Sequence, residues 1–124
     1  MDTRTKIIGR AEAQRIAGAG SRFMIVTGYF DPLTASHTRR LEEIAAAGDP
    51  LLAVVLNPEK PLLPARARAE LIAALAAIAH VVVEEGDPDW IADLPAARLL
   101  REEEADTMRT RDLIARVHQR QAAG

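Results

Sequence analysis

Most of the information about the fold lies in the stretch Ile25-Val-Thr-Gly-Tyr-Phe-Asp-Pro-Leu-Thr-Ala-Ser-His37. An apolar strand runs into Gly28, an aromatic-Asp-Pro turn follows, and a polar cluster ending at His37 opens a helix. In open α/β sheets, ligands bind at the carboxyl ends of the strands, where helix N-termini present free N–H groups to phosphate. Gly28 has no Cβ, so the backbone can approach a ligand closely there. The stretch therefore predicts a nucleotide phosphate site.

The segments around this stretch predict the fold class. Three short runs are apolar at nearly every position, as is typical of strands buried on both faces of a parallel sheet: Phe23–Val26, Leu51–Leu56 and Val81–Val83. The segments between them have helical spacing, over residues 37–47 and 64–79, with Pro64 suited to a helix start. The alternation β-α-β-α-β predicts an α/β fold, a three-layer Rossmann-like open parallel sheet with helices on both faces.

The remaining elements are weaker in the sequence. The pattern predicts a short helix over 10–19, a single helical turn over 90–94 stopped by Pro95, a short fourth strand over 97–100 and a last helix over 107–121. We expect one domain over residues 1–124, with a helical N-terminal extension over 1–20 and a C-terminal helix within 101–124.

Composition limits the functional classes. The chain has 124 residues, a net charge of −2 and no cysteine, which excludes a disulfide framework and gives no general attraction to nucleic acid or to anionic membranes. The N-terminus has no apolar segment typical of a signal peptide, and no apolar run approaches the length of a membrane span. We therefore expect a cytoplasmic protein whose partners are small molecules.

Residue by residue, the motif resembles the signature of the nucleotidylyltransferase superfamily, Gly-x-Phe-Asp-x-x-(His/Thr)-x-Gly-His. Five positions agree with it: Gly28, Phe30, Asp31, Thr34 and His37. The glycine before the final histidine is replaced by Ser36. Over roughly residues 6 to 95, the chain is most similar to the adenylyltransferase domain of bacterial ADP-heptose synthesis and to glycerol-3-phosphate cytidylyltransferases.

The resemblance implies transfer of AMP or CMP from ATP or CTP to a small phosphorylated sugar or polyol, with release of pyrophosphate. His37 would bind phosphate oxygens and stabilise the transition state, and Thr34 would donate beside it. Backbone N–H groups near Tyr29 and Phe30 would hold the nucleotide. Mg²⁺ would accompany the triphosphate, with no protein ligand assigned to it. Relatives dimerise, so a homodimer is also expected by resemblance.

Further candidate phosphate-binding residues have ordinary structural alternatives. Asp31 either contributes to the site or caps its own turn. Lys60, in the loop after the second strand, either binds phosphate or is solvated. Arg68 either serves the site or is an exposed helix residue paired with Glu70 or Asp49. Ser36 and Thr110 complete the set, Thr110 reaching phosphate from the start of the last helix.

Two departures from the family pattern leave a second hypothesis open. The basic loop that usually follows the second strand is shortened to Asn57–Leu63, and the late Ser-Thr-Thr helix start is replaced by Thr107-Met-Arg-Thr-Arg111, beside the acidic run Glu102–Glu104. The alternative to an enzyme is therefore a degenerate, non-catalytic nucleotide-binding or interaction module of the same fold. A dinucleotide-binding oxidoreductase is disfavoured, because Gly28 stands without the further glycines of that motif.

Overall fold

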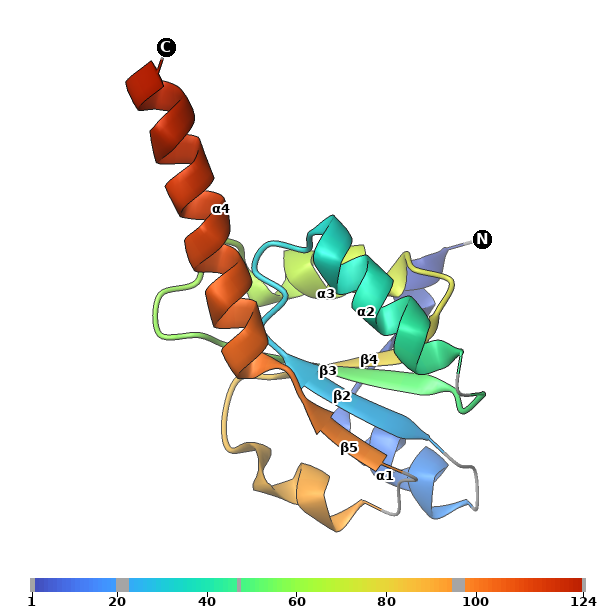
Figure 1. Cartoon of the computed structure of the whole chain (residues 1–124). Coiled ribbons are helices and arrows are strands. Elements are labelled where there is room, and N and C mark those ends of the chain that lie inside the picture. Colours follow the sequence, from blue (N-terminus) through green and yellow to red (C-terminus); the bar gives the residue numbers. More distant parts are fainter. Residues whose placement is uncertain (1, 20–22, 47, 95–97, 124) are drawn as a thin grey trace.

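A computed structural model describes residues 2–19, 23–46, 48–94 and 98–123, and its centre is a parallel sheet of five strands in the order β1-β4-β3-β2-β5 (Figure 1). All four strand pairings are parallel. The strands span β1 (Ile7–Ile8), β2 (Met24–Gly28), β3 (Leu51–Leu56), β4 (Ile78–Glu84) and β5 (Arg98–Arg101). The predicted α/β architecture is thereby confirmed.

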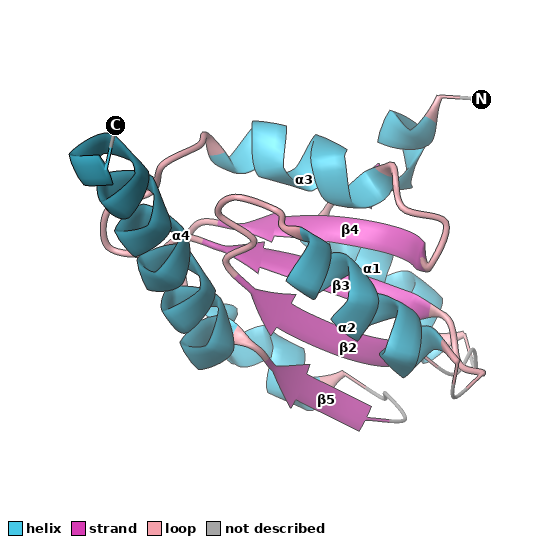
Figure 2. Cartoon of the chain, turned by 45° about the horizontal axis from the view of Figure 1, so that its top comes forward, coloured by secondary structure: helices cyan, strands magenta, loops and turns pink. Residues whose placement is uncertain are grey.

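Helices cover both faces of the sheet (Figure 2). Their bounds are η1 (Thr3–Lys6), α1 (Arg10–Gly18), α2 (Ala35–Ala45), α3 (Ala65–Ala73), η2 (Pro88–Asp93) and α4 (Glu103–Ala123), where η marks a 3₁₀ helix. Successive side chains of a strand point to opposite faces, so β2 contributes to two separate cores. Met24 and Val26 pack with residues of α2 and α3, whereas Ile25 packs with residues of α1 and η2.

The three predicted central strands all exist, with changes at their ends. β3 has the predicted bounds, β2 extends to Gly28, and β4 begins at Ile78 and ends at Glu84. The predicted fourth strand corresponds to β5, which pairs with β2. Residue 97, the first of that prediction, lies outside the described residues, as do Pro95 and residue 47.

Three predicted elements differ from the structure. The helix expected over 64–79 ends at Ala73, because Ile78 belongs to β4 and is buried in its core rather than continuing a helical stripe. The N-terminal extension over 1–20 is not purely helical, since it supplies β1, which pairs with β4. The last helix begins at Glu103, four residues before the predicted start at Thr107, and Arg101 still belongs to β5.

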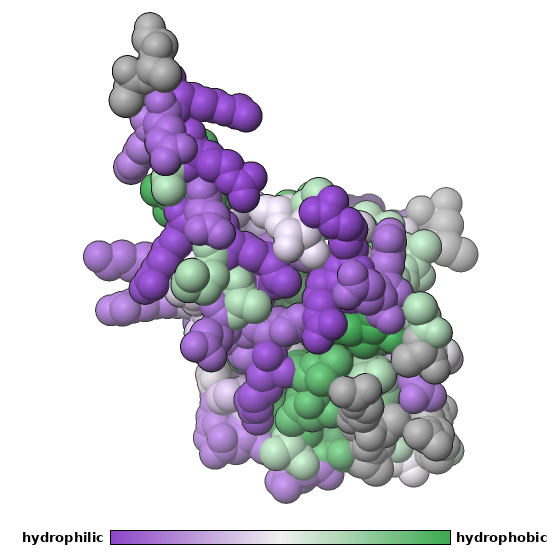
Figure 3. Space-filling model, in the orientation of Figure 1, coloured by the Kyte–Doolittle hydropathy of each residue, from purple (hydrophilic) through white to green (hydrophobic). Residues whose placement is uncertain are grey.

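Helix α4 starts at the carboxyl end of β5 and its C-terminal half projects beyond the rest of the molecule (Figure 1). Hydrophilic side chains dominate the face of this helix seen in Figure 3. Within the described residues, no helix is both long and apolar enough to cross a membrane.

Arg68 of α3 is fully buried and ties together the loops that follow β2 and β3. Its guanidinium donates to the carbonyl oxygens of Tyr29 (2.9 Å), Leu56 (2.8 Å) and Leu63 (3.0 Å), and to Asn57 Oδ1 (2.5 Å). Burial lowers the pKa of Arg68, and these oxygens compensate the buried charge. Its sequence-based alternative, an exposed residue paired with Glu70 or Asp49, is wrong.

His80 lies on β4 opposite Leu52, with its ring centroid 5.8 Å from that of Phe23. Its Nδ1 is buried without a hydrogen-bond partner among the described residues. Burial is the largest cause of a lowered pKa for His80, so the folded state favours the neutral imidazole.

Replacing Arg68 by Met should lower the free energy of unfolding by about 2–4 kcal/mol, because several buried oxygens lose their donor. Urea denaturation followed by circular dichroism measures this. The matched control is Arg66→Met on the same helix. Arg66 is exposed and pairs with Glu70 at 3.3 Å, so its loss should cost less than about 0.5 kcal/mol. Equal losses in the two variants would contradict the role assigned to Arg68.

The lowered pKa of His80 predicts an acid-side loss of stability. Below the ordinary histidine pKa of about 6.5, the unfolded chain takes up a proton at this position more readily than the folded chain. Stability should therefore fall as the pH drops below about 6.5. In His80→Gln, the difference in unfolding free energy between about pH 7.5 and 5.5 should be smaller than in the wild type. Identical differences in urea titrations would exclude His80 as the source.

Candidate active site

The site predicted from the sequence lies where the strand order reverses. From β2 the chain proceeds through β3 to β4 on one side, while β5 pairs with the other side of β2. In doubly wound sheets, ligands bind at such a point, beyond the carboxyl ends of the two neighbouring strands. Here the β2–α2 loop and the start of α4 meet at that edge. Asp106, the fourth residue of α4, thereby reaches the loop that follows Gly28.

The start of α2 fixes the orientation of His37. Thr34 is the N-cap residue, and its backbone N–H donates to His37 Nδ1 at 3.0 Å, in a capping box with the Thr34 hydroxyl. A backbone N–H can only donate, so Nδ1 is the acceptor and the proton of a neutral ring resides on Nε2. His37 is 2% exposed and directs this Nε2 towards α4.

The carboxylate of Asp106 occupies the space in front of His37. Asp106 is 1% exposed, and its Oδ2 accepts the backbone N–H groups of Tyr29 (2.8 Å) and Phe30 (3.2 Å). Its Oδ1 lies 2.7 Å from His37 Nε2 and accepts from Arg109 Nη1 at 2.8 Å. The imidazole contact is close but not aligned as a hydrogen bond, so Nε2 has no hydrogen-bond partner among the described residues.

The backbone of the loop creates the room for this carboxylate. A Cβ built on Gly28 would lie 2.5 Å from Asp106 Oδ2, closer than real contacts allow. Phe30 has a φ of +49°, in the left-handed region, and the N–H groups of Tyr29 and Phe30 converge on one oxygen. Convergent successive N–H groups of this kind form an anion-binding concavity.

Two further contacts join α4 to the loop. Arg109 Nε donates to Ser36 Oγ at 3.0 Å, so one guanidinium bridges Asp106 and the start of α2. The hydroxyl of Thr110 donates to the backbone oxygen of Asp31 at 2.8 Å. Ser36 and Thr110, both predicted site residues, therefore lie at the interface between the β2–α2 loop and α4.

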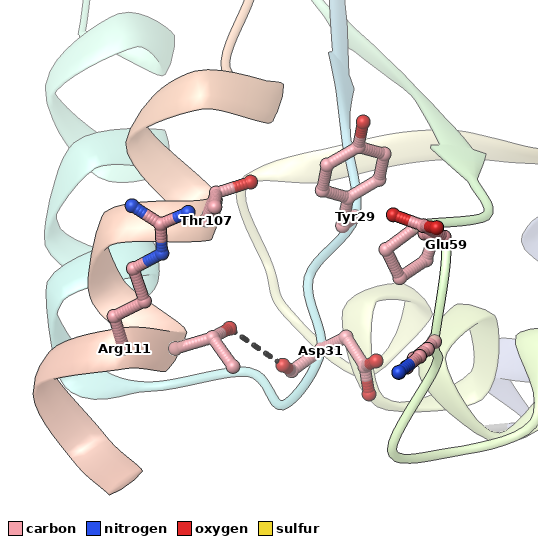
Figure 4. A pocket seen from close by; sticks show the side chains of 8 residues that line it. Tyr29, Asp31, Glu59, Thr107 and Arg111 are labelled. Atoms are coloured by element: carbon pink, nitrogen blue, oxygen red, sulfur yellow. Dashed lines mark hydrogen bonds between the residues drawn. The ribbon is translucent and has the colours of Figure 1, made fainter. Parts of the chain in front are cut away.

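A cavity of about 340 Å³ opens beside this interface. In Figure 4, Tyr29 and Asp31 lie between Thr107 and Arg111 of α4 on one side and Glu59 of the β3–α3 loop on the other. Lys60 also lines it. The cavity is large enough for part of a nucleotide, and both Lys60 and Arg111 contribute cationic groups to its wall.

The contacts of Asp31 differ from the alternative prediction, in which Asp31 caps its own turn. Its Oδ2 accepts the N–H of Leu62 (2.6 Å), and its Oδ1 accepts the N–H of Leu63 (2.8 Å). It is 3% exposed and thus holds the β3–α3 loop against the β2–α2 loop. Arg68 fastens the same two loops from within, with its donors turned towards protein oxygens.

The structure thus brings most predicted site residues to one edge of the sheet, where the β2–α2 loop meets the β3–α3 loop and the start of α4. Asp106 is the residue that the sequence analysis missed. It follows the acidic run Glu102–Glu104 and has no motif of its own. Only the order of the elements could have indicated Asp106. A helix that follows a parallel strand beside β2 must begin at the edge of the sheet where the Gly28–His37 motif lies.

The described part of the chain contains no group of three or more His, Cys, Asp or Glu side chains that could hold a metal ion. Both oxygens of Asp31 and both of Asp106 are already engaged by protein donors or contacts. Within the described residues, these two carboxylates are thus held by the protein's own groups.

Comparison with known proteins gives two informative likenesses. A FAD synthase from Haloterrigena turkmenica is 41% identical to the chain over 69 residues, which cover 51% of this chain and 48% of the relative. The chain therefore spans about half the length of this curated relative. No protein-family model matches.

The crystal structure of a lipopolysaccharide core biosynthesis protein from Thermoplasma volcanium matches with a TM-score of 0.57 and 24% identity. The match covers 64% of this chain and 73% of that one, and it shows the shared Rossmann-like fold. The first likeness covers about half of each protein, and the second shows a shared fold, so the two leave the family and the substrates of this chain open.

Proposed function

We propose that the chain binds a nucleoside triphosphate at the edge formed by β2 and β5 and transfers its nucleotidyl group to a small phosphorylated acceptor. The observation that carries this proposal is the donor cluster of the β2–α2 loop. It combines two convergent backbone N–H groups with the buried Nε2 of His37, whose Nδ1 is fixed as an acceptor by Thr34.

Each of these groups suits the α-phosphate reaction. An acceptor phosphate oxygen attacks the α-phosphorus, the bond to the bridging oxygen breaks, and pyrophosphate leaves. Negative charge grows on the non-bridging oxygens, where fixed donors stabilise it without reorganisation. His37 Nε2–H would donate there, beside the N–H groups of Tyr29 and Phe30. No covalent intermediate with the protein is needed.

The acceptor can be narrowed by chemistry. FAD consists of an AMP unit joined to FMN, a phosphorylated ribityl chain on a flavin, and the Haloterrigena relative is named for making FAD. FMN is therefore one acceptor to examine, together with sugar phosphates and glycerol 3-phosphate. The cavity lined by Tyr29, Lys60 and Arg111 supports a nucleotide, with its cationic side chains facing a phosphate chain.

A second candidate function is non-catalytic binding, and the position of Asp106 favours it. A buried carboxylate fills the space where the phosphate would lie, and Ser36 stands where the family has glycine. In that case the chain would bind nucleotide weakly or serve as an interaction module.

In an assay of pyrophosphate release, ATP or CTP with one acceptor of the panel should give turnover. His37→Gln should lower kcat/KM by about 100-fold or more, since the imidazole donor that Thr34 holds in place is lost. Calorimetric titration of both nucleotides with Mg²⁺ identifies the donor nucleotide independently of turnover.

The matched control is His118→Gln, which removes a histidine from the exposed part of α4. It should retain wild-type turnover. Binding of a nucleotide without turnover for any acceptor would favour the non-catalytic alternative. Turnover that survives in His37→Gln would sink the assignment of this site.

A further inference from the structure

The donor cluster of the β2–α2 loop is occupied by the protein's own anion. The backbone N–H groups of Tyr29 and Phe30 meet Asp106 Oδ2, while His37 Nε2 and Arg109 Nη1 meet Asp106 Oδ1. Four nitrogens from two segments thus surround two carboxylate oxygens. A phosphate group has more oxygens than a carboxylate and the same need for donors, so the same cluster suits it.

Two features indicate that the space enclosed by these four nitrogens is shaped for an anion in general. We call this space, which the Asp106 carboxylate fills, the anion pocket. The first is Gly28, where any Cβ would fill the place of the carboxylate oxygen. The second is His37 Nε2, which is buried, directed into the pocket, and has no hydrogen-bond partner among the described residues despite its 2.7 Å contact. A donor left unaligned by the carboxylate is available to a tetrahedral oxyanion, which presents oxygens in more directions.

We propose that Asp106 is a built-in competitor of phosphate: its carboxylate closes the nucleotide site, and a nucleotide binds only when this carboxylate leaves. The inference rests on the proposed nucleotide site, but it does not require turnover. It adds a regulatory role for the first turns of α4, where the sequence predicts only Thr110 as a phosphate-binding residue.

Besides the four nitrogens around its oxygens, local contacts hold Asp106 and the start of α4, among them the ion pair of Arg40 with Glu102 at 2.8 Å. Arg109 bridges Asp106 and Ser36, Thr110 donates to the oxygen of Asp31, and the N–H of Glu102 donates to the oxygen of Thr27 at 2.8 Å. The C-terminal half of α4 projects away from the sheet (Figure 1). Turning of the side chain or a shift of the first turns of α4 would therefore open the pocket.

The expected change in affinity follows from the fraction of molecules whose anion pocket is open. When only a fraction of the molecules has an open site, the apparent Kd is the intrinsic Kd divided by that fraction. Removing the competitor should therefore tighten phosphate binding. In Asp106→Ser, whose side chain is too short to fill the pocket, the Kd for tripolyphosphate and for ATP should fall by at least about 10-fold relative to the wild type.

The test is calorimetric titration of wild type, Asp106→Ser and Asp106→Asn with tripolyphosphate and with ATP. Glu104→Gln is the matched control, because it removes one carboxylate from an exposed position of the same helix. A gain in Asp106→Ser that exceeds the gain in Glu104→Gln supports the proposal. The gain should disappear in the double variant Asp106→Ser/His37→Gln. A folded Asp106→Ser that binds neither ligand more tightly overturns the proposal.

If both Asp106 variants fail to fold, the wild type decides the question. The backbone amide NMR signals of Tyr29 and Phe30 should shift as tripolyphosphate saturates the protein, because their N–H groups exchange a carboxylate for a phosphate. Binding that leaves these two signals unchanged, or no binding at all, overturns the proposal.

The experiments distinguish a failure of this proposal from a failure of the proposed nucleotidyl transfer. Tighter ATP binding by Asp106→Ser without turnover for any acceptor supports the competitor and contradicts nucleotidyl transfer. Turnover by the wild type, with no gain in binding by the variant, supports nucleotidyl transfer and contradicts the competitor.

Discussion

A buried carboxylate is stable only where donors replace its lost hydration, and Asp106 meets this condition at the edge of the sheet. Its partners come from the β2–α2 loop, from the first turn of α2 and from its own helix. The contact therefore fixes three things together: the course of the loop after Gly28, the ring of His37, and the position at which α4 begins. This edge of the sheet is organised around this one side chain.

The constraint behind this arrangement is the parallel pairing of β5 with β2. Because parallel strands end at the same edge, the helix that follows β5 must start beside the loop that follows β2. Arg68 and Asp31 then hold the β3–α3 loop against the same loop, through backbone oxygens and backbone N–H groups respectively. The two loops and the start of α4 are thereby fixed relative to one another, with a cavity between them.

The sequence was most informative where one face or both faces of an element are buried. β3 was predicted to the residue, since all six of its side chains are apolar. Ile78 was misplaced because an apolar residue after a helix fits either a continued helix or a new strand, and only the pairing of β4 with β3 decides. Asp106 and the buried role of Arg68 could not be predicted, because their partners are backbone groups of distant loops, which carry no sequence signal.

The retained motif of the β2–α2 loop and the altered start of the last helix are compatible with each other. Two of the donors in the anion pocket are backbone N–H groups, which no substitution of Tyr29 or Phe30 by another residue except proline would remove. In the mechanism proposed above, the loop supplies the donors for an anion, while Asp106 and Arg109 of α4 decide whether a carboxylate or a phosphate occupies them. A change at the start of one helix can therefore convert such a pocket between an open phosphate site and a closed structural one, with the signature of the β2–α2 loop intact.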